Sequence, residues 1–293
     1  MIWKGVMPAM TTAFRPDLSL DHESISKRAK WLIGSGCTGI VALGSLGEAA
    51  ALSRDEKTAV LKTIRTTIDA PLVSAISGLS TAETVALAKT AAEIGCNALM
   101  VLPPYVYRGD WRETKAHMAA IFQATPLPCM LYNNPVAYGT DFTPEQIVEL
   151  AGEHENLAAV KESSTDVRRV TAIRALLADR LAIFVGVDDA IVEGIAAGAT
   201  GWIAGLVNAF PEESVRLFDL ATAGRWPEAF ELYNWFLPLL RLDTVPKFIQ
   251  MIKLAEARAG VGSAKVRPPR LELEGDELAR TTSLIDEDRK SVV

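Results

Sequence analysis

The stretch Leu157-Ala158-Ala159-Val160-Lys161-Glu162-Ser163 decides how the rest of the chain is interpreted. Four apolar residues followed by a lysine are typical of a buried parallel strand with an ammonium group at its carboxyl end. Burying an unpaired ammonium costs several kcal/mol, so such a lysine loses its proton or pairs with an anion. The neutral amine would be a nucleophile. The plainer alternative is that Lys161 leaves the strand and reaches water, and this stretch alone does not decide between the two.

Seven other apolar runs resemble this one in length and composition. Their apolar residues are nearly continuous instead of alternating, which predicts parallel strands buried on both faces. With the first stretch they give eight predicted strands, at residues 5–12, 36–43, 71–76, 97–102, 128–132, 157–161, 181–185 and 199–204.

Segments with helical spacing separate the predicted strands. Asp21 and Ser53 are typical N-caps for two of them. Gly36, Gly95 and Gly198 each stand between a predicted helix end and the next strand, where glycine adopts the left-handed conformation that stops a helix. The predicted helices cover residues 21–33, 53–68, 81–94, 111–123 and 144–151, and three more begin after residues 166, 188 and 211.

Eight alternating strands and helices predict an α/β fold, a (β/α)8 TIM barrel with a C-terminal helical extension. A doubly wound sheet is disfavoured because no Gly-x-Gly-x-x-Gly turn follows the first strand. We place the catalytic barrel at residues 1–222 and the extension at 223–293, with helices from Trp226 to Leu240 and from Val245 to Ala259. The charged end from residue 272 onward is predicted to be a solvated tail or a loose helix.

Composition excludes several classes of function. The 293 residues are 49% hydrophobic and 23% charged, with a net charge of −6. These values predict a soluble globular protein without the basic face that nucleic-acid binding needs. No membrane-length apolar run or signal peptide is seen, so we expect no membrane partner and a cytoplasmic location. Three cysteines without metal-type spacing, Cys37, Cys96 and Cys129, are predicted to be buried thiols, and no metal site is expected.

Reacting groups in a TIM barrel lie where strands end. Ser45 follows the second strand, Tyr132 ends the fifth and Lys161 ends the sixth. Each has a plainer interpretation, as a turn serine, a core aromatic or a solvated lysine, and Asp188 after the seventh strand is typical of a helix cap. Together, an amine, a phenol and a hydroxyl on one rim suit imine chemistry.

Three motifs carry a family resemblance, and they read Gly44-Ser45-Leu46-Gly47-Glu48, Tyr132-Asn133-Asn134-Pro135 and Val160-Lys161-Glu162-Ser163. They resemble the Gly-[Thr/Ser]-x-Gly-Glu, Tyr-Asn-x-Pro and Lys-Glu-x-Ser motifs of the dihydrodipicolinate synthase and N-acetylneuraminate lyase family. This family comprises Schiff-base class I aldolases and related hydro-lyases. The resemblance extends from Trp3 to about Val261.

The resemblance implies a role for individual residues. Lys161 would form the Schiff base, Tyr132 would transfer protons, and Ser45 would take the position of the relay hydroxyl. The substrate carboxylate would lie among Ser45, Leu46, Gly186 and Ile203. No metal or organic cofactor is implied, because the lysine imine itself is the electron sink.

Departures from the family pattern narrow the expected substrate. Leu46 replaces a second hydroxyl, so the carboxylate would rely on backbone N–H groups. Val106 falls at the place of a tyrosine that a neighbouring subunit supplies in the resembling synthases, and whether Tyr107 substitutes for it is left open. Their substrate-binding arginine falls on Ala137, which removes a charge-assisted contact to a second carboxylate. Synthase activity is therefore not expected as the main role.

Three further strings resemble the bacterial Δ1-pyrroline-4-hydroxy-2-carboxylate deaminases of hydroxyproline degradation, and they lie at residues 133–138, 205–211 and 235–240. The resemblance predicts a lyase that converts 1-pyrroline-4-hydroxy-2-carboxylate to 2-oxoglutarate semialdehyde and ammonia. The alternatives are an aldolase or dehydratase acting on pyruvate or another 2-keto acid, and a non-catalytic barrel that binds a keto acid.

Substrate choice is expected at a distal pocket formed by Tyr138, Gly139, Leu206 and Asn208. The expected partner molecule is thus a 2-keto acid or a cyclic imino acid. The family resemblance and the helical extension also predict a homotetramer built as a dimer of dimers.

Overall fold

Eight strands form one closed parallel ring in the computed structural model, which describes residues 2–104 and 106–290. The hydrogen-bonded order is β1-β8-β7-β6-β5-β4-β3-β2. Beyond β1 the backbone changes partner, because the Ala9 N–H donates to Ala204 and the Met10 N–H donates to Val41, each over 2.9 Å. This exchange closes the ring between β1 and β2. The strands are β1 Gly5–Pro8, β2 Ile40–Ala42, β3 Leu72–Ile76, β4 Ala98–Val101, β5 Cys129–Asn133, β6 Leu157–Glu162, β7 Ala182–Val185 and β8 Gly201–Ala204.

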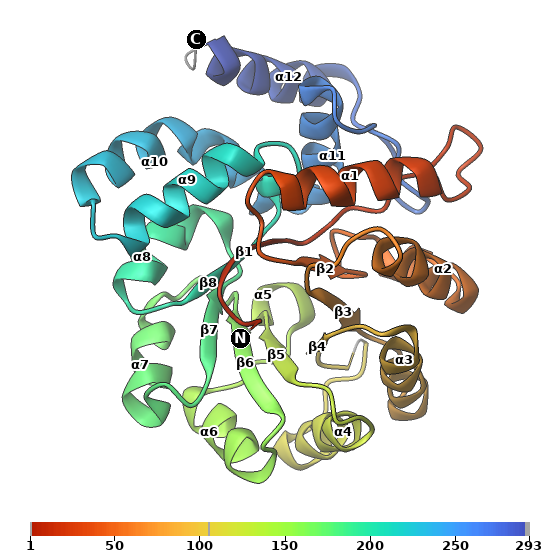
Figure 1. Cartoon of the computed structure of the whole chain (residues 1–293), viewed down its shortest axis with the longest axis vertical. Helices are drawn as coiled ribbons and strands as arrows, with labels where there is room; N and C mark the ends of the chain where they lie inside the picture. The colour runs from red at the N-terminus through yellow and green to blue at the C-terminus, as the bar shows by residue number, and fades with distance from the viewer. Residues whose placement is uncertain (1, 105, 291–293) are drawn as a thin grey trace.

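A ring of helices surrounds the strands (Figure 1). The predicted caps are confirmed: Asp21 accepts from the Ser24 N–H, and Ser53 forms a capping box with Glu56. The three predicted glycine stops all have positive φ angles, between 91° and 104°. The helices of the ring are α1 His22–Gly34, α2 Arg54–Arg65, α3 Thr81–Ile94, α4 Trp111–Gln123, α6 Pro144–Glu153, α7 Arg168–Leu177, α8 Ile191–Ala196 and α9 Pro211–Thr222, whereas the short α5 Pro135–Tyr138 lies inside the ring, directly after β5. The (β/α)8 prediction is confirmed.

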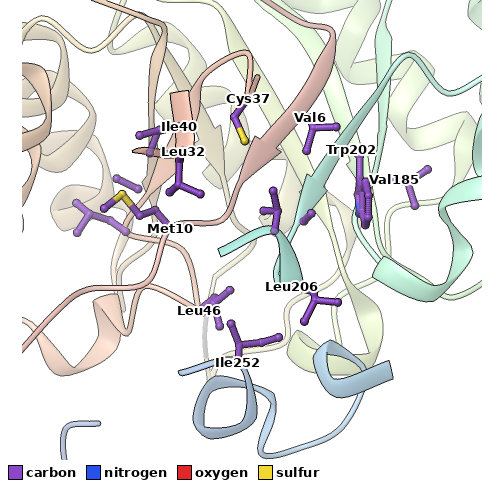
Figure 2. Close-up of a cluster of buried hydrophobic side chains, with 14 of the residues drawn as sticks. Val6, Met10, Leu32, Cys37, Ile40, Leu46, Val185, Trp202, Leu206 and Ile252 are labelled. Carbon is purple, nitrogen blue, oxygen red and sulfur yellow. The ribbon is translucent and has the colours of Figure 1, made fainter. Parts of the chain in front are cut away.

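Two layers of apolar side chains hold the barrel together. The inner layer fills the ring, and at its amino-terminal end Trp3 packs edge-on against Phe184 with centroids 6.2 Å apart. The outer layer lies between strands and helices and includes Trp202 and Val185 (Figure 2). The barrel is therefore a packed core that leaves only its rim for chemistry. All three cysteines are buried free thiols, as predicted.

The C-terminal extension consists of α10 Trp226–Leu240, α11 Phe248–Ala259 and α12 Gly275–Lys290. The charged end was predicted to be a solvated tail or a loose helix; its described part does form a helix, but α12 packs beside α11 and is neither solvated throughout nor loose (Figure 1). Ile285 is fully buried, and the ion pairs Lys247–Glu277 and Arg258–Asp286, each 2.5 Å, join the two helices. In the described ranges, no helix is long and apolar enough to span a bilayer.

Two buried ion pairs fasten α11 to the barrel. Glu48, after β2, receives the Lys253 ammonium at 2.6 Å, and Arg28 of α1 pairs with Glu256 at 2.7 Å. All four side chains are 3% exposed or less. Because Glu48 closely follows Ser45, the extension supports the loop that carries one of the predicted site residues.

Candidate active site

Lys161 and Tyr132 lie side by side at the carboxyl end of the barrel. They are register partners on β6 and β5, so strand pairing fixes their separation. The Lys161 ammonium is 4.3 Å from the centre of the Tyr132 ring, and both residues are about 5% exposed. On the other side, Lys161 pairs in register with Phe184 of β7. The amine thus lies buried against the Tyr132 ring, and the alternative of a lysine that reaches bulk water is excluded.

Asn133 follows Tyr132, Glu162 follows Lys161, and a hydrogen bond between these two residues joins the strand ends. Asn133 donates through Nδ2 to the Glu162 carboxylate over 3.0 Å, and Ser164 N–H donates to the same carboxylate over 2.7 Å. Asn133 also accepts from the Phe142 N–H over 3.0 Å. Burial is the main cause that raises the pKa of Glu162, while these donors oppose it. The motif residues Asn133 and Glu162 therefore act as a scaffold beneath Tyr132 and Lys161.

Gly186, directly after β7, leaves space for the lysine. A Cβ atom on this residue would overlap the Lys161 side chain and the Ser163 hydroxyl. Ser163 is 2% exposed, and its hydroxyl has no hydrogen-bond partner among the described residues. Sequence reasoning missed Ser163 as a site group. Its signal was position, because residues two apart on a strand point to the same face.

Ser45 does not pair with Tyr132. Its hydroxyl is instead hydrogen-bonded to the hydroxyl of Tyr138, which ends the short helix α5. The Tyr138 ring packs edge-on against the Tyr132 ring, with centroids 5.6 Å apart. The Tyr132 hydroxyl accepts from Asn134 Nδ2 over 3.0 Å, which leaves its own proton available. Ser45, Tyr138, Tyr132 and Lys161 thus form one contiguous group at the rim.

Leu46 and Ile203, two of the residues expected around the substrate carboxylate, lie in different layers of the core. The Leu46 side chain is 3% exposed and points into the outer core near Leu206 and Ile252 of α11 (Figure 2). Only its backbone can therefore face a ligand. Ile203 is 1% exposed and belongs to the inner layer with Tyr132.

Asp188 is not a helix cap, so that interpretation was wrong. Its carboxylate accepts from Trp202 Nε1 at 3.0 Å and from the N–H groups of Gly205 and Leu206 at 2.8 to 3.1 Å. The next helix has Ala190 at its N-cap and no side-chain cap. Burial raises the pKa of Asp188 to about 6, although these donors oppose the rise. Asp188 therefore links the ends of β7 and β8 beside the lysine.

A second carboxyl reaches this edge from the extension. Asp243, between α10 and α11, lies directly against Gly205, where a Cβ atom would overlap it. Burial and the neighbouring Asp188 carboxylate hold the pKa of Asp243 well above its ordinary value, while Lys161 lowers it. Sequence reasoning missed Asp243, and no local signal points to it, because its neighbour Gly205 lies on a distant segment of the chain.

The loop after β4 does not bring Tyr107 to the site within this chain. Tyr107 is 59% exposed and donates to the Glu113 carboxylate over 3.0 Å, while Val106 is 92% exposed. Arg108 of the same loop lays its guanidinium against Gly139, just beyond Ala137.

Two of the four residues expected in a distal pocket lie in the core instead. Leu206 belongs to the outer core. The Asn208 side chain donates to the carbonyls of Ala9 and Gly205, both over 2.9 Å, and accepts from Arg28 at 3.2 Å. Both residues are fully buried, so Tyr138 and Gly139 are the two that remain at the rim.

Residues 2–288 match the dihydrodipicolinate synthetase family. The chain belongs to this family. It is thus an enzyme of the class I aldolase and lyase type, and that part of the expectation is confirmed.

Three relatives illustrate the similarity. A 4-hydroxy-tetrahydrodipicolinate synthase of Xanthomonas axonopodis pv. citri is 35% identical over 271 residues, which is 89% of this chain and 87% of the relative. A putative dihydrodipicolinate synthetase of Pseudomonas aeruginosa has a solved structure with a TM-score of 0.93 and 30% identity, covering 98% of this chain and 99% of that one. The chloride-inhibited dihydrodipicolinate synthase of Acinetobacter baumannii, solved with pyruvate, is 28% identical with a TM-score of 0.91 and the same coverage. The substrate of the present chain stays a prediction.

Proposed function

We propose that this family member is a Lys161-dependent deaminating hydro-lyase of 1-pyrroline-4-hydroxy-2-carboxylate. The observation that carries the proposal is the enclosed Lys161 amine, held 4.3 Å from the Tyr132 ring with Gly186 clearing space beside it. The strings that resemble the deaminases support the choice of substrate. The absence of a guanidinium at position 137 further favours a substrate with one carboxylate.

The reaction begins at the ring imine. Neutral Lys161 attacks the carbon of the C=N bond, and imine exchange opens the ring to give a lysine Schiff base and a free amine on C5. The protonated Schiff base draws electrons, so Tyr132 assists removal of a C3 proton and departure of the C4 hydroxyl as water. Tautomerisation moves unsaturation to the C5 amine. Two water molecules then hydrolyse the C5 imine and the lysine imine, which yields ammonia and 2-oxoglutarate semialdehyde.

The remaining site residues hold the substrate carboxylate in this proposal. Ser45 offers its hydroxyl, and Leu46 offers its backbone N–H because its side chain points into the core. Gly186 and Ile203 form the opposite wall beside Lys161. A carboxylate held here places the adjacent C=N carbon within reach of the amine, and such positioning is a large part of catalysis.

Exposed apolar side chains at the rim support an assembly of several copies of the chain. Leu79, Val106 and Val136 are each more than 70% exposed and lie in the segments that follow β3, β4 and β5. Apolar side chains gathered on one rim are typical of an interface. We therefore propose the homotetramer that the family resemblance implies, and size-exclusion chromatography with light scattering tests it.

Two measurements test the function. Borohydride with pyruvate should reduce an adduct onto Lys161, identified by mass spectrometry and absent in Lys161→Ala. An adduct-free wild type would favour a keto-acid-binding barrel without catalysis. Ammonia release should then follow addition of the pyrroline substrate. An adduct with pyruvate but no ammonia release would refute the deaminase assignment and leave the Schiff-base chemistry intact.

One observation favours a second candidate, an aldolase or dehydratase for a 2-keto acid with a distal anionic group. Arg108 places a guanidinium against Gly139, near the position where the resembling synthases carry their arginine. Turnover of a sugar-derived or dicarboxylic keto acid, with a KM raised at least 10-fold by Arg108→Ala, would support this candidate over the deaminase.

A further inference from the structure

The proton path to the Schiff base is the feature that extends the proposed function. Imine formation needs a proton donor for the departing oxygen or nitrogen, and the donor must be resupplied from water. Ser45 stands in the group around Lys161, but a single serine hydroxyl is a weak acid and needs a second group behind it. The structure places such a group in direct contact with Ser45.

We propose that Tyr138 is the positioning residue that resupplies Ser45, so that the relay is complete within one chain. The Ser45 and Tyr138 hydroxyls are hydrogen-bonded to each other. Tyr138 lies at the end of α5, between buried Tyr132 and the exposed rim residues Ala137 and Gly139. In this proposal its hydroxyl passes protons between the buried site and water at the rim.

Local structure explains how a tyrosine reaches this position. Asn134 caps α5 by accepting from the Ala137 N–H over 3.0 Å, and Gly139 ends the helix with a φ of 71°. One helical turn between a cap and a left-handed glycine orients Tyr138 back towards β5. The edge-on contact with Tyr132, at 5.6 Å, then fixes its ring.

Tyr107, a further phenol in the described part of the loop after β4, is directed elsewhere. Tyr107 donates to the Glu113 carboxylate, and this bond together with the carboxylate charge raises the Tyr107 pKa. A phenol committed to a carboxylate in its own chain is a poor proton donor for Ser45. Tyr107 thus serves as the natural control.

Each proton that the proposed relay gives to the substrate is replaced from water. When Lys161 attacks pyruvate, the carbinolamine oxygen takes one proton from Ser45 and a second from the attacking nitrogen, which keeps one proton. The oxygen then leaves as water, and the protonated imine remains. The Tyr138 proton replaces the one that Ser45 gave, and rim water reprotonates Tyr138. For a cyclic imine the same proton moves to the ring nitrogen. No redox partner or further co-reactant is needed.

Exchange of the pyruvate methyl protons in D2O, followed by NMR, tests this step without a physiological substrate. Tyr138→Phe keeps the ring and its packing but removes the hydroxyl, so we expect the maximal exchange rate to fall by about 10- to 100-fold. The pyruvate KM should change by less than a factor of about 2, because the relay acts on transition states. Ser45→Ala should lose a similar amount, and the double variant should be no slower than the slower single variant.

The outcomes separate this inference from the proposed function, on which it rests. A wild type that forms no borohydride adduct refutes the Schiff-base chemistry itself. If the wild type forms the adduct but Tyr138→Phe exchanges methyl protons at the wild-type rate, only the role of Tyr138 is refuted. The same holds if the exchange rates of the two single variants fall by factors that multiply in the double variant. Tyr107→Phe should exchange at the wild-type rate, and a large loss there would assign the relay to Tyr107 instead.

Discussion

Removing Lys253 tests whether the extension is fastened by a buried charge pair. The Lys253 ammonium donates to Glu48 and to the Lys265 carbonyl, both at 2.6 Å, and Lys253 and Glu48 are 1% and 0% exposed. Lys253→Met keeps the side-chain length but leaves the Glu48 carboxylate buried without its cation. Breaking a buried pair in this way costs about 3–5 kcal/mol.

The expected magnitude lies near the lower end of that range. Glu48 keeps the Arg267 N–H at 2.9 Å, and the Arg270 guanidinium lies 4.0 Å away. We therefore expect the free energy of unfolding to fall by about 3 kcal/mol, measured by urea denaturation at one fixed protein concentration. Adding Glu48→Gln removes the stranded charge, so the double variant should recover at least half of the loss.

An exposed pair of the same type provides the control. Lys265 pairs with Glu272 at 2.5 Å, and the two side chains are 40% and 45% exposed. Lys265→Met should change stability by less than about 0.5 kcal/mol, since solvent screens exposed pairs. A Lys253→Met variant within about 1 kcal/mol of the wild type, or a double variant with additive losses, would refute the reasoning.

Three further predictions concern other parts of the barrel. Because burial raises the folded-state pKa of Asp188 to about 6, above its unfolded value, the folded protein binds more protons between about pH 4 and 6. Stability should fall as the pH rises through that window, and Asp188→Asn should flatten this part of a urea-unfolding pH series. For Glu56 the pH dependence of stability has the opposite sign, since its bond to Arg267 lowers its pKa to about 2. Acidification from about pH 4.5 to 2 should therefore cost the wild type about 1 kcal/mol of unfolding free energy, a value discounted for partial exposure, and Glu56→Gln should not show this loss. Gly186→Ala should slow borohydride trapping at Lys161 by more than about 10-fold, whereas Gly152→Ala, which meets no atom within 4 Å, should trap normally.

The barrel was predictable because its signals are local and repeat eight times. Continuous apolar strands, N-caps such as Ser53 and glycine stops such as Gly95 each depend on neighbouring residues only. The proximity of Lys161 and Tyr132 followed from one further rule, that the ends of adjacent parallel strands meet. Their register pairing bears this out.

The contacts that sequence reasoning missed depend on residues far apart in the chain. Ser45 and Tyr138 are separated by 93 positions, and α5 is too short to show a helical pattern. Asp188 looked like a helix cap because an acidic residue before a helix usually is one. Its partners Trp202 and Gly205 lie on the next strand and the turn after it, so a rule based on neighbouring residues does not predict these contacts.

The charged tail was misjudged for a related reason. A segment with many charges usually stays in water, but α12 needs only a narrow apolar face to pack. Ile285 of α12 and Leu273, just before this helix, are buried, and ion pairs to Lys247 and Arg258 neutralise part of the charged face. Composition describes all residues of a helix together, whereas packing depends only on the residues of the face that contacts a neighbour.

The extension therefore contributes to the rim as well as to stability. Its α11 supplies Lys253 to Glu48, three residues after Ser45, and the segment before α11 places Asp243 against Gly205. A loop held by a buried charge pair has little freedom, because moving it would separate the charges in a medium of low dielectric constant. We therefore expect the hydrogen bond between Ser45 and Tyr138 to depend on the ion pair that holds Glu48 against Lys253. Substitutions in α11 should thus lower the rate of the proposed proton relay, measured by exchange of the pyruvate methyl protons in D2O, before they unfold the barrel.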